Sequence, residues 1–194
     1  LNLSLIGNYQ VENASIAVET VLQLRKFGFR VSENAIRKAL KTTFFPGRFE
    51  IKELKIGNWK LKIVLDGAHN PIKMKAFLET LKELFPKERK VFIVGFKFDK
   101  DIKKMLKEIL GEADEIIVTE FKGKTDMEVR ASAKATAVAK EIKKLSNKVI
   151  KVEKNSKKAL EKALGNLTME QFNNGTIIVV TGSLYLVGEV RSML

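Results

Sequence analysis

The sequence contains no cysteine, three prolines, one histidine and one tryptophan among its 194 residues. Without cysteine the chain forms neither a disulfide nor a thiolate metal site, and one histidine with few clustered carboxylates argues against a metal site held by this chain alone. No apolar run approaches the roughly 20 residues that a membrane-spanning helix needs, and no basic stretch followed by an apolar one opens the chain as a secretion signal would. We therefore expect a cytoplasmic protein with no membrane partner.

Two common nucleotide-binding loops are also missing. Gly123-Lys124-Thr125 looks like the end of a phosphate-binding P-loop, but the glycine required five residues before Gly123 is replaced by Val118. The dinucleotide fingerprint G-x-G-x-x-G follows none of the predicted strands. A nicotinamide or flavin cofactor therefore has no support in this sequence.

Acidic residues are outnumbered by basic ones: the sequence has 23 Asp and Glu residues and 36 Lys and Arg residues, for a formal net charge of +13. Such an excess suggests a nucleic-acid partner. Here the lysines alternate with glutamates at helical spacing, which is typical of a solvated helix surface. We therefore expect no nucleic-acid partner, and a basic nucleic-acid-binding module remains the competing interpretation.

Hydrophobic residues make up 45% of the sequence, enough to build a substantial core. Their spacing predicts a strand over residues 1–6 and two helices, followed by a hairpin and then alternating helices and strands. This order predicts an α/β fold with a mostly parallel, doubly wound, Rossmann-like sheet and an antiparallel edge hairpin strand. The predicted helices cover 8–27, 36–41, 72–84, 100–110, 131–145, 156–164 and a segment from about 184, and the predicted strands cover 49–56, 59–65, 90–95, 115–119, 149–152 and 176–181.

The segment Asp66-Gly67-Ala68-His69-Asn70-Pro71 lies where a predicted strand ends and a helix begins. Ligands bind at this edge of an open α/β sheet, and a carboxylate there can accept hydrogen bonds from ribose hydroxyls. Asp66 could equally serve as a turn or helix-capping residue, and a lone histidine suits a structural role as well as a site. The small Gly67 and Ala68 favour function, because they would let a ligand approach the backbone.

Several motifs together resemble those of folylpolyglutamate synthase/dihydrofolate synthase, a branch of the Mur ligase superfamily. The matching segments are Gly7-Asn8-Tyr9-Gln10 with Asn13-Ala14, Pro46-Gly47-Arg48-Phe49-Glu50, the hexapeptide at 66–71, Gly95 through Asp101, and Thr181 through Arg191. The resemblance implies an enzyme that uses ATP and Mg²⁺ to activate a carboxylate of folate or dihydropteroate as an acyl phosphate, which L-glutamate then attacks. Another Mur-type amino-acid ligase with a different acceptor is the alternative.

The resemblance also implies that this chain is the last part of such an enzyme. Residues 1–45 would be the tail of a central ATPase domain, and residues 46–194 would be the C-terminal domain. The P-loop, the magnesium ligands and a carbamylated lysine would lie upstream, so the chain would be inactive alone and would need that upstream domain as its partner.

By matched position, Asn13, Arg48 and Asp66 resemble the family's ATP contacts. His69 would lie beside the nucleotide as the catalytic candidate, and Ser183 would help hold a carboxylate of the incoming glutamate. Tyr9 departs from the histidine that many relatives carry before Gln10, which weakens any role for that pair. We expect Asp66→Ala and Arg48→Ala to weaken ATP use more than folding.

Overall fold

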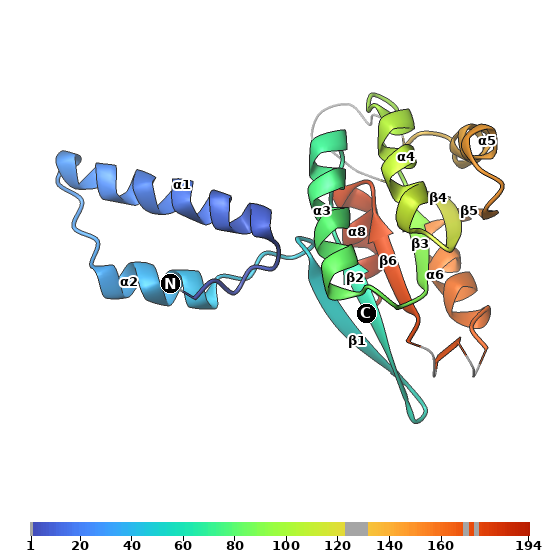
Figure 1. The fold of residues 1–194 in the computed structure, drawn as a ribbon, viewed down its shortest axis with the longest axis horizontal. Helices are drawn as coiled ribbons and strands as arrows, with labels where there is room; N and C mark the ends of the chain where they lie inside the picture. Colours follow the sequence, from blue (N-terminus) through green and yellow to red (C-terminus); the bar gives the residue numbers. More distant parts are fainter. Residues whose placement is uncertain (1, 123–131, 169–170, 173–174) are drawn as a thin grey trace.

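The computed structural model describes all residues except 1, 123–131, 169–170 and 173–174, so Gly123-Lys124-Thr125 lies outside the described residues. Two parts are visible in Figure 1. A pair of helices, here called the helical arm (residues 2–45), projects from a wound sheet that carries helices on both faces. The described helices do not include one with the length and apolarity that a bilayer crossing requires.

The helical arm consists of α1 (Asn8–Leu24), η1 (Arg25–Phe27) and α2 (Glu33–Thr42). Gly28 ends the first helical segment with a φ of 86°, a conformation that glycine adopts without steric cost. The predicted strand over residues 1–6 is wrong for its described part, because residues 2–6 are not in a strand. Instead, the Ser4 amide donates to the Leu40 carbonyl oxygen at 3.0 Å, so this segment bonds to the end of α2.

Six strands form one sheet in the order β1-β2-β6-β3-β4-β5. Only the β1–β2 hairpin is antiparallel, and the other neighbours are parallel, which confirms the predicted fold class. All residues of β3 and β6 are buried, as expected for central strands covered on both faces. The strands are β1 (Glu50–Ile56), β2 (Trp59–Leu65), β3 (Lys90–Val94), β4 (Glu115–Glu120), β5 (Val149–Asn155) and β6 (Ile177–Thr181).

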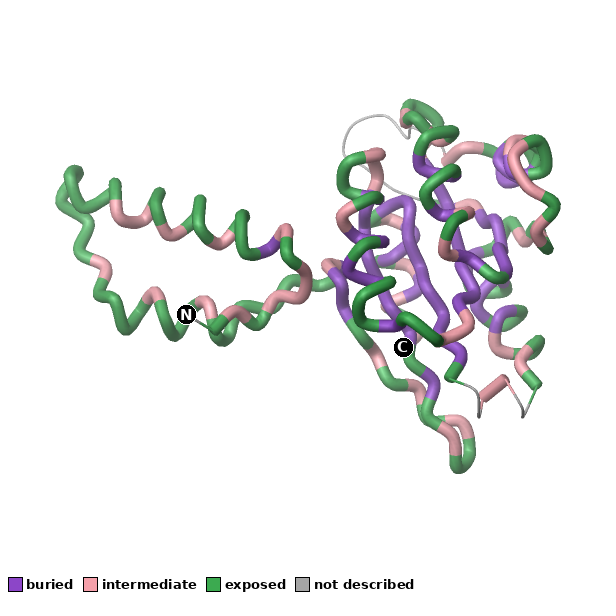
Figure 2. Tube along the Cα trace, viewed as in Figure 1, coloured by how far each residue is buried: buried purple, intermediate pink, exposed green. Residues whose placement is uncertain are grey.

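Helices cover the two faces of this sheet and enclose separate hydrophobic cores (Figure 2). One face carries α3 (Pro71–Leu84), α4 (Ile102–Glu112) and α5 (Ala135–Leu145), and the other carries α6 (Ser156–Gly165) and α8 (Leu184–Arg191). Helix α5 begins later than residue 131, where the sequence pattern predicts it. Its preceding segment is extended, since Ser132 pairs with Lys97 and the Ala133 amide donates to the Phe96 carbonyl oxygen at 2.7 Å.

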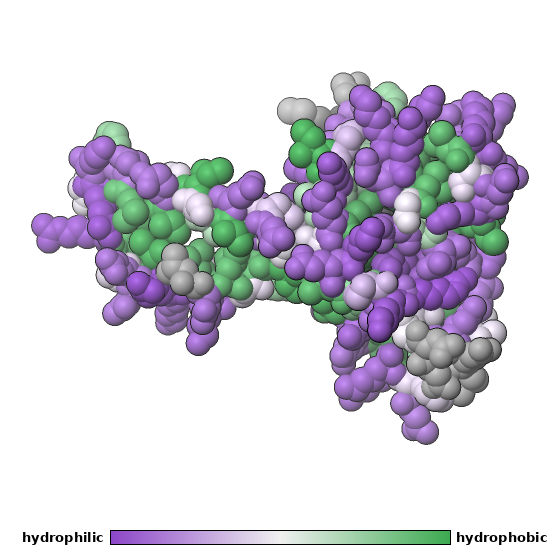
Figure 3. Space-filling view, viewed as in Figure 1, coloured by the Kyte–Doolittle hydropathy of each residue, from purple (hydrophilic) through white to green (hydrophobic). Residues whose placement is uncertain are grey.

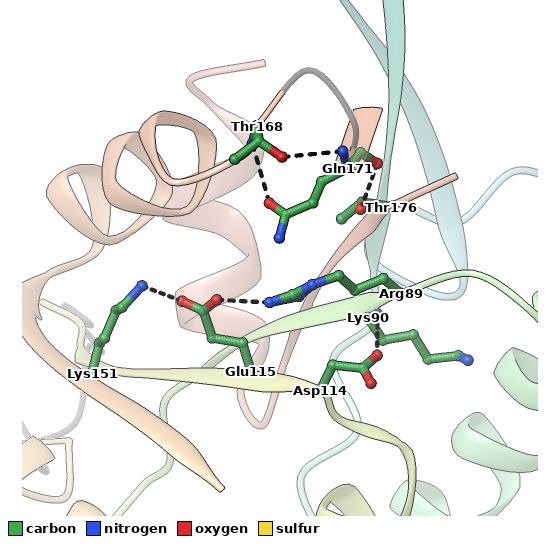
Figure 4. A network of polar contacts seen from close by, with 8 residues as sticks. All are labelled: Arg89, Lys90, Asp114, Glu115, Lys151, Thr168, Gln171 and Thr176. Atoms are coloured by element: carbon green, nitrogen blue, oxygen red, sulfur yellow. Dashed lines mark hydrogen bonds and ion pairs between the residues drawn. The ribbon is translucent and has the colours of Figure 1, made fainter. Parts of the chain in front are cut away.

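The acidic residues at the amino ends of the parallel strands serve the fold. Glu115, which is 7% exposed, bonds to Arg89 at 3.1 Å and to Lys151 at 2.6 Å (Figure 4). Asp114 accepts a hydrogen bond from the Lys90 amide at 2.7 Å. These contacts join β3, β4 and β5 at the edge opposite to the one where ligands bind in α/β sheets.

Glycines allow the loops at the carboxyl edge of the sheet to pack closely against their neighbours. A Cβ atom added to Gly67 would lie 2.2 Å from Cδ2 of Leu184, in the first turn of α8, and one added to Gly182 would lie 2.6 Å from the Gly95 carbonyl oxygen. The space beside Gly67 is therefore filled by protein, and the prediction that its small size admits a ligand is wrong. Gly67 is small so that α8 can rest on the turn that follows β2.

The substitution Gly67→Ala tests this packing. We expect it to lower the free energy of unfolding by roughly 1–3 kcal/mol, the usual cost of overpacking, because Leu184 must move. Gly188→Ala is the matched control: its Cβ meets nothing within 4 Å, and alanine in a helix is favoured over glycine by about 0.5–1 kcal/mol. Urea denaturation measures both, and equal stability of wild type and Gly67→Ala would contradict the packing assignment.

Candidate functional site

A cavity of about 450 Å³ lies between the helical arm and the carboxyl edge of the sheet. Three of the predicted site residues line it: Asn13 from α1, Arg48 from the turn before β1, and Asp66 from the turn after β2. The structure therefore brings together side chains that are far apart in the sequence. The complete lining is Leu5, Tyr9, Gln10, Glu12, Asn13, Phe45, Arg48, Asp66, Ile72, Lys73 and Ala76.

Asp66 is only 3% exposed, and its carboxylate joins two turns. One oxygen accepts a hydrogen bond from the Phe49 amide at 2.8 Å, and the other accepts one from the Ala68 amide at 2.8 Å. Phe49 has a φ of 44°, the only positive φ of a non-glycine residue in the described chain. Helix α3 is capped by Asn70, whose side chain accepts from the Lys73 amide, so Asp66 is not its cap.

Burial raises the pKa of Asp66 to about 6, against the opposing effects of the two amide hydrogen bonds and the charges of Arg48 and Lys73. At neutral pH the carboxylate is therefore ionised, but it lacks part of the solvation that water would supply. Each oxygen keeps a lone pair beyond its backbone bond. A ligand that donates hydroxyl hydrogen bonds would stabilise the charged form, as ribose does in other α/β domains.

The backbone around Arg48 is fixed by a second carboxylate. The Gly67 amide donates to the Gly47 carbonyl oxygen at 2.8 Å, and the Gly47 amide donates to Glu50 at 2.9 Å. The Nε–H of Arg191 in turn donates a hydrogen bond shared by the two oxygens of Glu50, at 3.0 and 2.8 Å. Burial would raise the pKa of Glu50, but the bonds from Arg191 and Gly47 bring it below its usual value.

Arg48 itself is half-buried, with its guanidinium 5.9 Å from the centroid of the Phe45 ring. None of the ion pairs formed by the described residues includes Arg48. The turn thus presents to the cavity a planar cation that forms no ion pair with the described residues. Such a group suits bidentate binding of phosphate.

Tyr9 is a site residue that sequence reasoning undervalued. It lines the cavity beside Asp66, and the pKa of its hydroxyl is raised chiefly by burial and also by the Asp66 charge. Its neighbour Gln10 is 5% exposed and accepts a hydrogen bond from the Asn13 amide group at 3.1 Å. Tyr9 therefore places a phenol beside Asp66 in the cavity.

His69 lies three residues after Asp66 but does not line the cavity. Its Nδ1 is 2.8 Å from the Gly67 carbonyl oxygen, and since a carbonyl only accepts, Nδ1 carries the proton and Nε2 is left as an acceptor. Burial lowers the pKa of His69, and the charges of Lys73, Arg48 and Lys100 lower it further. The imidazole is thus neutral at neutral pH.

Ser183 is at the same sheet edge but outside the cavity. It is 3% exposed and caps α8, with its Oγ accepting from the Tyr185 amide at 3.2 Å. The adjacent Leu184 packs on Gly67, so the start of α8 borders the turn that holds Asp66. No three His, Cys, Asp or Glu side chains of the described residues gather closely enough to hold a metal ion. Fold and cavity define an α/β domain with a polar cavity at the carboxyl edge of its sheet.

Comparison with known proteins identifies the family. The profile of the dihydrofolate synthetase C-terminal domain matches residues 49–193. The chain is 29% identical to the folylpolyglutamate synthase of Lacticaseibacillus casei, over 100% of this chain and 40% of that protein. The chain therefore belongs to the family of dihydrofolate synthetase C-terminal domains, which confirms the resemblance carried by the motifs.

Solved structures agree. A folylpolyglutamate synthase from Thermotoga maritima has a TM-score of 0.68 and 32% identity, over 99% of this chain and 40% of that one. Escherichia coli FolC in complex with DHPP and ADP has a TM-score of 0.75 and 25% identity, over 100% of this chain and 40% of that one. The chain thus spans about 40% of the length of the relatives it matches.

The only histidine of the chain gives a direct test of the site's electrostatics. We expect proton NMR to show a pKa for His69 below 6.5 in the folded chain and near 6.5 in urea. Because the unfolded state then binds the proton more tightly, stability contributed by neutral His69 is lost as pH falls through 6.5 and below. Lys73→Met should raise the pKa of His69, whereas a folded-state value above 6.5 would contradict the proposed surroundings.

Proposed function

We propose that this chain is the C-terminal part of an ATP-dependent ligase that joins L-glutamate to folate, to dihydropteroate or to both. The family match and the names of the relatives support this class of enzyme. The observation that carries the proposal for this chain is the single cavity lined by Asn13, Arg48 and Asp66. These are the residues whose positions resemble the family's ATP contacts.

In this proposal residues 1–45 end a central ATPase domain and residues 46–194 form the C-terminal domain. Gln10 is the only buried residue in the described helices of the helical arm, so those helices have no core of their own. Apolar side chains are exposed along the arm, where Figure 3 shows a green surface between the two helices. These are Val11, Ile16, Leu24, Phe27, Phe29, Phe44 and Phe45. An upstream domain packed on the arm would cover them.

The cavity suits one half of a nucleotide. The Asn13 amide group would face the adenine or ribose, the Asp66 carboxylate would accept from ribose hydroxyls, and the Arg48 guanidinium would meet phosphate charge. The phosphate-binding loop and the magnesium ligands would come from the upstream domain, since this sequence lacks a P-loop and the described residues form no metal-binding cluster. The chain alone is then expected to be inactive.

The reaction transfers the γ-phosphoryl group of ATP to a carboxylate oxygen of the folate substrate, and ADP leaves. The amino nitrogen of glutamate then attacks the carbonyl carbon of the acyl phosphate, forming the amide as phosphate leaves. Closure of this domain over ATP would exclude water, which otherwise hydrolyses the acyl phosphate. His69, neutral and with Nε2 free, would accept a hydrogen bond beside the nucleotide, and Ser183 would help hold a glutamate carboxylate.

Joining this chain to the upstream region of the Thermotoga maritima relative tests the proposal. We expect the joined protein to form ADP only with both glutamate and a folate substrate, and the chain alone to form none. Arg48→Ala should raise the KM for ATP about ten- to hundredfold, the loss expected for hydrogen bonds to a charged group, while the free energy of unfolding stays nearly unchanged.

Arg37→Ala is the matched control, because Arg37 is exposed on α2 and pairs only with Glu33. It should leave both the KM for ATP and the stability at wild-type values. Turnover by the chain alone, or an unchanged KM for ATP in Arg48→Ala, would contradict the proposal.

A further inference from the structure

Lys97 is a half-buried cation that does not line the cavity described above. It follows β3 and lies at the carboxyl edge of the sheet. Its ammonium is 4.5 Å from the centroid of the Tyr185 ring, and that ring is stacked on Phe121 with a centroid distance of 6.0 Å and an angle of 9°. The aromatic pair restricts where the ammonium can lie, because cations are attracted to the face of the ring.

Lys97 forms no ion pair with an acidic side chain of the described residues. The ion pairs of the described residues engage other lysines, and none of them includes Lys97. Lys151, which is also partly buried, instead bonds to Glu115 at 2.6 Å. One point of this edge therefore carries a cation that an aromatic ring holds and that has no acidic partner among the described residues.

Tyr185 links Lys97 to Ser183. Tyr185, which holds the ammonium, is the residue whose amide donates to Ser183 Oγ at 3.2 Å. The loops after β3 and β6 also touch, since a Cβ on Gly182 would lie 2.6 Å from the Gly95 carbonyl oxygen and 2.8 Å from the Phe96 ring. Lys97 and Ser183 thus come from two loops in direct contact and converge on the first turn of α8.

We propose that Lys97 binds a carboxylate of the incoming glutamate, held in place for this by the stacked rings of Tyr185 and Phe121. This inference rests on the proposed function, in which Ser183 contributes to the same subsite. Lys97 supplies the positive charge that Ser183 lacks. A carboxylate that moves from water into a binding site needs a cation or several hydrogen-bond donors to replace its solvation. The nucleotide cavity is separate, since it is lined by neither Lys97, Ser183 nor Tyr185.

The simplest alternative is that Lys97 only covers the ring with its apolar stem while its charge faces water. Lys97→Met separates the two roles, since methionine keeps a flexible apolar stem of similar length and removes the charge. Lys62 provides the matched control. Lys62 belongs to β2, and its ammonium lies 5.5 Å from the centroid of the Phe85 ring, away from α8.

The chain has only two tyrosines, Tyr9 in the nucleotide cavity and Tyr185 at α8. Labelling tyrosine with ¹⁵N therefore gives two amide signals, which the Tyr9→Phe variant assigns. We expect L-glutamate, added at constant ionic strength against chloride, to shift the Tyr185 signal in a saturable way and to leave Tyr9 in place. Lys97→Met should raise the half-saturating concentration about tenfold or more, and Lys62→Met should not change it.

Each result is decisive. No saturable shift of Tyr185 in the wild-type chain would overturn the inference, and so would a wild-type response in a folded Lys97→Met variant. Failure of the proposed function is detected separately, as absence of glutamate-dependent ADP formation in the joined enzyme. A shift of Tyr185 that Lys97→Met abolishes, with the Tyr9 signal unmoved, supports the inference.

Discussion

The buried carboxylate of Asp66 is the interaction on which the rest of the site depends. It accepts one hydrogen bond from Phe49 and one from Ala68, and so joins the turn before β1 to the turn after β2. Neither turn is part of a helix or strand, and Phe49 holds a strained positive φ. Without this carboxylate two buried amides would lose their partners, at a cost of about 1–3 kcal/mol each. Arg48 lies between Gly47, which is bonded to Gly67, and Phe49, which is bonded to Asp66, and takes its position from them.

Asp66 thus has a structural role in addition to the nucleotide contact proposed for it. The sequence motifs predict that Asp66→Ala harms ATP use more than folding, but the bonds from Phe49 and Ala68 indicate that folding depends on this side chain as well. Arg48 makes no such bonds, so it is the cleaner probe of nucleotide binding. Burial, which raises the pKa of Asp66 to about 6, also leaves an ionised group that gains from hydroxyl donors. In the proposed function, the same carboxylate holds the two turns together and binds the nucleotide.

Much of the fold could be predicted from the sequence, because its elements follow local rules. The alternating hairpin residues and the apolar runs of β3 and β6 predict the observed strands. The strand expected at residues 1–6 does not form over the described residues 2–6, because an apolar pattern cannot reveal whether a neighbouring strand is present. The late start of α5 depends on pairing between Ser132 and Lys97, which are distant in the sequence.

The site could be predicted in part. The motifs indicate Asn13, Arg48 and Asp66, and the structure gathers all three around one cavity. The sequence could not show that Leu184 fills the space beside Gly67, nor that Tyr9 reaches Asp66, because these contacts join residues far apart in the chain. His69 and Ser183 lie near the cavity but outside it, and their roles stay predictions.

The most direct test of the central claim is amide hydrogen exchange at Phe49 and Ala68, measured by NMR at pH 7 in the wild type and in Asp66→Asn. Asparagine keeps the size of the side chain but replaces one acceptor oxygen with an NH₂ donor. We predict slow exchange of both amides in the wild type and at least about tenfold faster exchange of one of them in the variant, since one hydrogen bond to a charged acceptor is lost. Unchanged exchange of both amides would contradict the account.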